Sequence, residues 1–132
     1  MALAVLNLHL VGWVHKNLRS SNIVFFRPGP DWSLTNKERL ADPWLCGFEY
    51  SRPEANGAES WKLEDPNLLR NTYRHPDRWG KPTVTFERKH DIYALGVVLL
   101  EIGLWEPAVS FQSRGFEDWS QDKERGNYIK DV

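Results

Sequence analysis

A short polar segment near the start of the chain, residues 15–22, holds side chains that could do chemistry. It reads HKNLRSSN and lies between two apolar runs. Polar groups held at the edge of an apolar scaffold are typical of loops that bind or catalyse. The candidate side chains are the imidazole of His15, the amides of Asn17 and Asn22, and the guanidinium of Arg19.

Each of these side chains also has a structural interpretation. Asn17 and Asn22 could hydrogen-bond the backbone of their own loop. One neutral amide without a carboxylate beside it is a poor ligand for Mg²⁺, so metal binding at Asn22 is the less favoured interpretation. His15 is expected to pack and hydrogen-bond inside the fold, because no partner that would orient a catalytic histidine is evident in the sequence.

The composition fits one soluble globular domain. The chain has 132 residues, 41% of them hydrophobic, and a formal net charge of −1. This balance gives no reason to expect nucleic acid or an anionic membrane as a partner. The start MALAVLNLHL lacks the basic region of a signal peptide, and the run ALGVVLLEIGLW is too short and too charged, with Glu101, to span a membrane. A cytoplasmic protein is expected.

The sulfur and imidazole ligands are sparse. Cys46 is the single cysteine, which excludes an internal disulfide and fits a reducing compartment. His15, His75, His90 and Cys46 do not have the spacing of zinc ligands, so no structural zinc site is expected.

The elements that would position the polar segment can be read from periodicity. Residues 2–10 predict a helix with Leu3, Leu6 and Leu10 on its apolar face, ended by Gly12. Residues 23–26, IVFF, predict a short strand, and Leu45 to Tyr50 a second one. Residues 51–72 predict an exposed loop with a helical turn near 67–70.

The strongest helix signal is HDIYALGVVLLEIG, residues 90–103. Apolar residues cover most of its circumference, which predicts a helix buried in the centre of a domain. Asp91 is placed to cap its start and Gly103 to end it. Buried packing is also expected for the tryptophans that flank these segments, namely Trp13, Trp44, Trp79 and Trp105.

The spacing H-x-x-L-x-x-x-N at His15, Leu18 and Asn22 resembles the catalytic loop of the protein-kinase superfamily. Three further segments are similar to elements of that family in the same order. The segment LCGFEYSR at 45–52 is similar to the one that carries the metal-binding D-F-G, which corresponds to residues 47–49 here. The segment YRHPD at 73–77 is similar to the A-P-E element, which corresponds to residues 75–77. The segment DIYALGVVLLEIG at 91–103 is similar to the central helix of the family. The sequence of these segments also resembles divergent fungal kinase-like domains.

The resemblance implies a mainly α fold with short β-hairpin elements, the C-terminal lobe of the kinase-like α+β fold. It implies a partial kinase-like domain over residues 1–112, followed by a charged tail at 113–132. The family's N-terminal lobe carries a Gly-rich phosphate loop, and no G-x-G-x-x-G occurs in this chain, so that lobe is expected to be absent.

Two departures from the family pattern bear on activity. Asn17 stands where the family has the aspartate that accepts the substrate proton, and Gly47 where it has the metal-binding aspartate. Arg19 could still meet a phosphate, and Asn22 matches an asparagine that holds Mg²⁺. Glu49 lies two residues beyond Gly47, and Asp42 is a rival for the metal-binding position. ATP and Mg²⁺ are implied by the family, but these departures weigh against both.

Two carboxylates have structural roles by resemblance. Asp91 is expected to hydrogen-bond backbone amides of the catalytic loop, whereas a plain helix cap would contribute about 1 kcal/mol. Asp77 stands where the family has a glutamate that pairs with a distant arginine, and here Asp77 is expected to be unpaired.

The resemblance implies a catalytically inactive pseudokinase fragment that serves signalling as a binding or regulatory module with a protein partner. One alternative is an ATP-dependent protein kinase that works with Asn17 and takes its N-terminal lobe from elsewhere. Another alternative is a truncated product that does not fold stably, because a missing lobe would expose apolar surface.

Overall fold

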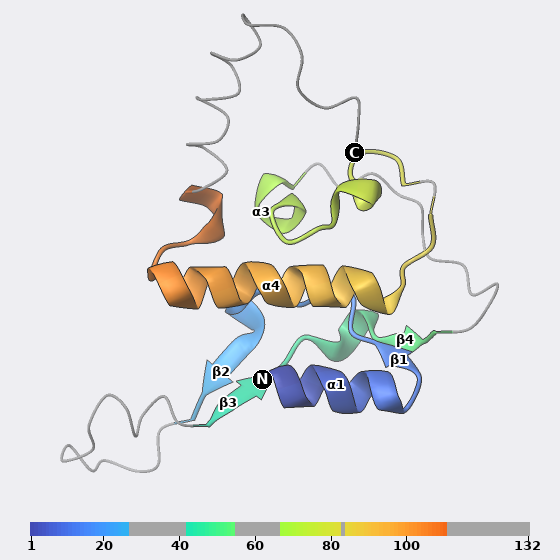
Figure 1. The fold of residues 1–132 in the computed structure, drawn as a ribbon, viewed down its shortest axis with the longest axis horizontal. Helices are drawn as coiled ribbons and strands as arrows, with labels where there is room; N and C mark the ends of the chain where they lie inside the picture. The colour runs from blue at the N-terminus through green and yellow to red at the C-terminus, as the bar shows by residue number, and fades with distance from the viewer. Residues whose placement is uncertain (27–41, 55–66, 83, 111–132) are drawn as a thin grey trace, which may run out of the picture.

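The structure is a computed structural model that describes residues 1–26, 42–54, 67–82 and 84–110. The expected tail at 113–132 lies outside the described residues. The described part is mixed α and β, and helix α4 runs across its middle (Figure 1). The elements in chain order are α1 Ala2–Leu10, β1 Trp13–Val14, η1 Ser20–Asn22, β2 Ile23–Phe25, β3 Pro43–Leu45, η2 Phe48–Tyr50, β4 Arg52–Pro53, α3 Leu68–Asn71, η3 Pro76–Arg78 and α4 Arg88–Leu104.

Two small antiparallel sheets lie on the same side of α4 as α1, whereas α3 lies on the other side (Figure 1). Strands β2 and β3 pair Ile23 with Leu45 and Phe25 with Pro43. Strands β1 and β4 pair Trp13 with Pro53. The strand predicted at 23–26 is therefore confirmed, and so is the helical turn predicted near 67–70, as α3.

The strand predicted from Leu45 to Tyr50 is wrong in position. Strand β3 ends at Leu45, and Phe48–Tyr50 form a 3-10 turn instead. Gly47 separates the two with a φ of 85°. This left-handed conformation interrupts an extended run and is readily adopted only by glycine.

Helix α1 has the predicted bounds but buries a different face. Val5 and His9 are its buried residues, whereas Leu3, Leu6 and Leu10 are exposed. Val5 packs in the hydrophobic core, and His9, four residues later, turns inward to reach Asp91 on α4. One apolar and one polar contact therefore define the buried face of this helix.

Helix α4 begins and ends beyond the predicted residues. It starts at Arg88 with Glu87 as N-cap, so Asp91 lies inside the first turns rather than at the cap. The backbone N–H of Glu87 donates to Nδ1 of His90 at 2.7 Å, which satisfies one of the amides near the helix start. The C-cap is Trp105 in the left-handed region at φ 55°, not Gly103.

The expectation of a wholly buried α4 is also wrong for the described residues. One face of the helix is buried and packs Ala94 and Leu95 against Val5 and Leu18 in the hydrophobic core. The opposite face exposes Ile92, Leu99 and Ile102. The four flanking tryptophans are exposed rather than buried, namely Trp13, Trp44, Trp79 and Trp105. None of the described helices is both long and apolar enough to cross a bilayer.

Candidate functional site

The polar segment 15–22 is anchored to α4 by Asp91, which is completely buried. One carboxylate oxygen accepts the backbone N–H of His15 at 2.7 Å, and the other accepts that of Lys16 at 2.9 Å. The expected contact between Asp91 and the loop amides is therefore present. His9 Nε2 lies 3.0 Å from Oδ2 of the same carboxylate, a contact that the sequence did not suggest.

Asp91 also holds an unfavourable backbone conformation in place. Lys16 has a φ of 69°, in the left-handed region that costs a residue with a side chain roughly 1–2 kcal/mol. Such a residue persists only when its surroundings fix it, and the hydrogen bond from its N–H to Asp91 is part of that support. The loop geometry therefore depends on a residue of α4.

His15 is packed rather than presented for catalysis. Its ring is fully buried and meets Phe48 edge-on, with 4.6 Å between ring centroids. Its Nδ1 accepts the backbone N–H of Asn17 at 3.3 Å. Burial lowers the pKa of His15, although the Asp91 carboxylate opposes this, so the neutral imidazole is the favoured form near neutral pH. The structure agrees with the packing interpretation.

Asn17 faces the segment that follows β3. Its Nδ2 donates to Oε1 of Glu49 at 2.8 Å and to the backbone carbonyl of Gly47 at 3.4 Å. Asn17 thus holds a carboxylate beside the position where the family resemblance puts a base. An amide has no basic group to accept a proton at neutral pH, so Asn17 can orient Glu49 but cannot replace an aspartate.

Asn22 and Gly47 share one small volume. Asn22 Nδ2 donates to the backbone carbonyl of Asn17 at 2.8 Å, and the backbone carbonyl of Asn22 accepts the N–H of Cys46 at 2.8 Å. A β-carbon built on Gly47 would lie 2.3 Å from Asn22 Nδ2 and 2.6 Å from Asn22 Cγ. Two features therefore favour glycine at residue 47, its positive φ and the nearby side chain of Asn22.

These residues do not fit the Mg²⁺ that the resemblance implies. Magnesium in nucleotide sites is bound through one or two carboxylates with waters and phosphates. Position 47 carries no side chain, and the Asn22 amide group fills the space beside it. One carboxylate oxygen of Glu49 accepts from Asn17. Arg19 lines a cavity together with Asn17 and residues of η3 and α4, and its Nε is buried without a partner among the described residues.

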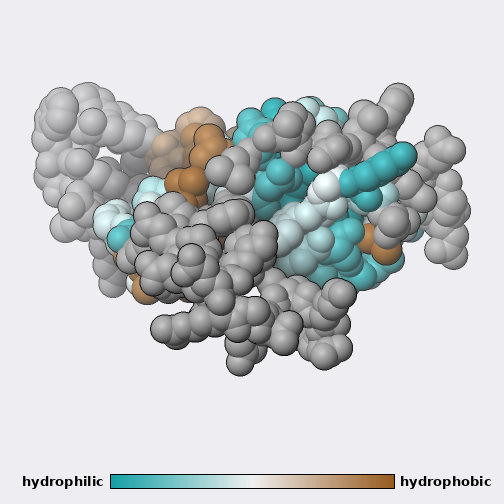
Figure 2. Space-filling model, turned by 90° about the horizontal axis from the view of Figure 1, so that it is seen from above, coloured by the Kyte–Doolittle hydropathy of each residue, from teal (hydrophilic) through white to brown (hydrophobic). Residues whose placement is uncertain are grey.

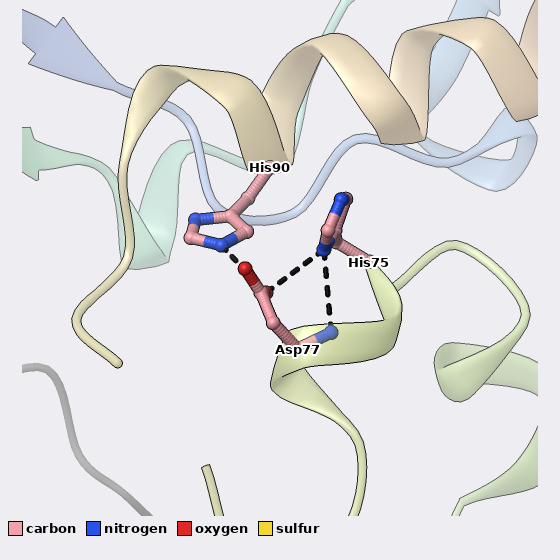
Figure 3. A group of neighbouring side chains, drawn as sticks. All are labelled: His75, Asp77 and His90. Atoms are coloured by element: carbon pink, nitrogen blue, oxygen red, sulfur yellow. Dashed lines mark hydrogen bonds and ion pairs between the residues drawn. The ribbon is translucent and has the colours of Figure 1, made fainter. Parts of the chain in front are cut away.

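A second polar group joins the start of α4 to η3 (Figure 3). Asp77 Oδ1 lies 2.8 Å from His90 Nε2 and 2.9 Å from His75 Nδ1. Asp77 Oδ2 lies 3.1 Å from the ammonium of Lys89. The expectation that Asp77 lacks a partner is therefore wrong. We call His75, Asp77 and His90 the histidine clasp.

The histidine clasp brings together residues whose spacing suggested no metal site. Its ligand atoms lie within 4.8 Å of one another, so the geometry alone would admit a cation. The hydrogen bonds oppose it, because His90 Nδ1 accepts a hydrogen bond from the backbone N–H of Glu87, and Nε2 then carries the ring proton and donates it to Asp77. A metal-binding histidine needs the reverse arrangement. The clasp is therefore a hydrogen-bonded link.

Sequence reasoning did not identify Glu101 as a buried hydrogen-bond acceptor. This buried glutamate accepts from the hydroxyl of Tyr73 at 2.8 Å and from the N–H of Ala108 at 2.7 Å. Tyr73 in turn lies 2.9 Å from Ser20, which connects the polar segment to the far end of α4. The available signal was the single glutamate, Glu101, inside an otherwise apolar helical run.

Comparison of the chain with models of known protein families, with curated proteins and with solved structures gives no match.

Proposed function

We propose that the chain is the C-terminal lobe of a protein kinase-like domain that does not transfer phosphate. In this proposal it serves as a binding or regulatory module, in the cytoplasm and with a protein as its partner. The mixed α and β architecture is compatible with such a lobe. The motif order and the Asp91 hydrogen bonds to the loop amides support the same assignment.

One observation carries the loss of catalysis, the overlap between Asn22 and any side chain at position 47. A metal-binding carboxylate at that position would need a β-carbon 2.3 Å from Asn22 Nδ2. Real β-carbons do not approach other atoms so closely, so the Asn22 side chain would have to move from its hydrogen bond to Asn17. The loss is therefore supported by the packing of the loop as well as by the residue type.

The alternative function, phosphoryl transfer by an active kinase, is favoured by a different observation. The Glu49 carboxylate lies 2.8 Å from the side chain that stands at the base position, and it is exposed. A carboxylate there could act as the general base in place of the missing aspartate. This candidate requires Glu49 for activity and a nucleotide bound in the presence of Mg²⁺.

The test is a thermal melt of the 132-residue chain with ATP, with and without Mg²⁺, run beside the Glu49→Gln variant. A nucleotide that binds only the folded chain adds about 2.7 kcal/mol of stability at a hundredfold excess over its dissociation constant. The proposal expects a cooperative melt with no Mg²⁺-dependent shift. A Mg²⁺-dependent shift would support the kinase. Because Glu49 would act there on the substrate hydroxyl and not on the nucleotide, Glu49→Gln should keep that shift and abolish phosphate transfer to a protein substrate. A melt without cooperativity would contradict both functions.

A further inference from the structure

One face of helix α4 is apolar and open to solvent. Ile92 is 54% exposed and Leu99 is 50% exposed. From Ile92 to Leu104 the helix has one charged residue, Glu101, and that residue is buried, so the open face carries no charge over this length. On the surface seen from above, apolar residues gather on the left, the side on which α4 ends, beside a hydrophilic middle (Figure 2). A contiguous apolar surface is typical of a site where another molecule binds.

The open face of α4 alternates large side chains with glycines. Four exposed residues follow one another at spacings of four, three and four residues, namely Ile92, Gly96, Leu99 and Gly103. This spacing puts them on one line along the helix, and we call them the α4 seam. A β-carbon built on Gly96 or on Gly103 meets nothing within 4 Å. The space over each glycine is therefore open to a side chain from outside.

The α4 seam is complementary to its own reverse. When two copies of the helix lie antiparallel about a two-fold axis at the centre of the seam, Ile92 of one copy comes opposite Gly103 of the other. Leu99 then comes opposite Gly96. Each large side chain meets the open space over a glycine, which is the knob-into-hole arrangement of paired helices. A parallel pair would instead set leucine against leucine and glycine against glycine.

The charges at the two ends of the seam suit the same antiparallel arrangement. Lys89 stands three residues before Ile92, and Glu106 stands three residues after Gly103. The two-fold axis therefore brings the ammonium of Lys89 toward the carboxylate of Glu106 in the other copy. Lys89 contacts Asp77 at 3.1 Å, yet its side chain is 51% exposed, so a second carboxylate can reach it. The positive start of each helix also lies beside the negative end of the other, which is favourable.

We infer that a second copy of this chain binds here, as an antiparallel two-fold pair joined through the α4 seam. An isologous contact of this kind closes after two copies and does not extend into a filament. One helix face offers fewer residues than the roughly 20–30 a side of a stable complex, so the pair forms reversibly and depends on concentration. Below its dissociation constant the chain is single and the seam is open. Chemical denaturation at such concentrations reports the single chain.

Pairing through the α4 seam goes beyond the proposed function and does not depend on it. The contact needs no nucleotide, no Mg²⁺ and no residue of the polar segment 15–22. A chain that binds no nucleotide can therefore pair, and a chain that stays single can still be a binding module. The two proposals are thus tested by separate measurements.

The experiment is sedimentation equilibrium of the 132-residue chain from micromolar to millimolar concentration. We expect the mass to rise with concentration from that of one chain, 15.4 kDa, toward twice that value. Leu99→Ala removes a large side chain from both copies and should weaken pairing about tenfold or more. Leu6→Ala makes the same change on α1 at a matched exposure, 52% against 50%, and should pair like the original chain.

The glycines of the seam supply a sharper test. Gly96→Leu fills the space that receives Leu99 of the other copy, so this variant should remain single. Its β-carbon meets nothing within 4 Å in the single chain, so the variant should still fold. Combining Gly96→Leu with Leu99→Ala again sets a large side chain opposite a small one, and pairing should return. A thermal melt of each variant checks that it is folded before its mass is compared.

Three results would overturn the inference. The first is a mass of one chain at every concentration, which would leave the open face of α4 to a different protein. The second is a loss of pairing in Leu6→Ala as large as in Leu99→Ala. The third is a Gly96→Leu variant that pairs as well as the original chain, because the seam would then lie outside the contact. If Gly96→Leu does not fold, the comparison of Leu99→Ala with Leu6→Ala decides.

Discussion

The imidazole of His9 and the carboxylate of Asp91, 82 residues apart in the chain, meet at 3.0 Å in the interior. His9 belongs to α1 and Asp91 to α4. The same carboxylate holds the loop between them through two backbone amides. One side chain therefore fixes two helices and the polar segment relative to one another.

Asp91→Ala should destabilise the chain by about 2–6 kcal/mol, because one buried and one partly buried amide lose their acceptor at about 1–3 kcal/mol each. A residue that only capped a helix would cost about 1 kcal/mol. Urea denaturation measures the difference. The exposed Asp42→Ala variant removes an equal charge and should change stability little; a cost for Asp91→Ala near that of a cap would contradict the link role.

Gly47→Ala should cost more stability than Gly12→Ala. Both glycines have positive φ, 85° and 77°, but a β-carbon at Gly12 meets nothing within 4 Å, whereas one at Gly47 meets Asn22. The difference in unfolding free energy between the two variants isolates the overlap. In an Asn22→Ala background the excess cost at position 47 should shrink; additive costs in the double variant would argue against the overlap.

Stability should fall when the pH drops from 7.5 to 5.5. Burial lowers the pKa of His15 and of His90 below the ordinary 6.5, so the unfolded chain binds more protons in this window. The stability of the neutral rings is complete above pH 6.5 and is lost as the pH falls through the lowered pKa values, by at most about 1.4 kcal/mol per pH unit for each histidine. Denaturation at several pH values gives the slope.

The pH slope has a specific control. In the variant with His15→Asn and His90→Asn, the amide oxygens can still accept the backbone protons of Asn17 and Glu87, but nothing titrates at these positions. Hydrogen bonds from Lys89 and His75 hold the pKa of Asp77 below 3.8 against the opposing effect of its burial, so that carboxylate stays charged in the window. An unchanged slope in the double variant would show that other groups set the pH dependence.

Two neighbouring positions on α4 should differ in how much a substitution destabilises the chain. Val98 is 1% exposed and Leu99 is 50% exposed. Val98→Ala should cost roughly 1–3 kcal/mol in lost apolar burial, whereas Leu99→Gln should change the unfolding free energy by less than about 0.5 kcal/mol. Chemical denaturation of both variants is the measurement. Equal costs would mean that the exposed face of α4 is covered in solution.

The histidine clasp should not hold a tetrahedral metal ion. Its proton arrangement, set by the Glu87 N–H, and the ammonium of Lys89 on Asp77 both oppose a dication. Titration with Co²⁺ should therefore leave the visible spectrum without the intense bands of a tetrahedral site. Bands that vanish in His75→Asn would overturn the hydrogen-bonded interpretation.

Local pattern was enough to predict the bounds of α1, the strand at 23–26 and the position of α4 within two residues. These elements follow from periodicity and turn residues that lie within one short window. The strand pair of Trp13 with Pro53 was not predictable in this way, because two-residue strands leave no periodicity to detect. The positive φ of Gly47, which ends β3, was equally invisible in the apolar pattern.

The site was predicted in its composition but not in its connections. The motif grouped His15, Asn17 and Asn22 correctly in one loop and pointed to Asp91. It could not show that His9 would turn inward, because the apolar pattern of residues 2–10 predicts that the leucines of this helix face the core. The pair H-x-D at 75–77 followed by a histidine near a helix start was the signal for the clasp, but only the fold brings His90 beside it.

Strands β2 and β3 lie side by side up to their last pair, in which Phe25 is opposite Pro43. The chain between them therefore departs and returns at adjacent points, on the far side of the hairpin from the register that seats Asn22 beside Gly47. Lengthening a connection of this kind costs only about 0.6 kcal/mol for each doubling of its length. A reporter domain or affinity tag inserted between residues 26 and 42 should thus leave the pairing of β2 with β3 and the contacts of the polar segment unchanged.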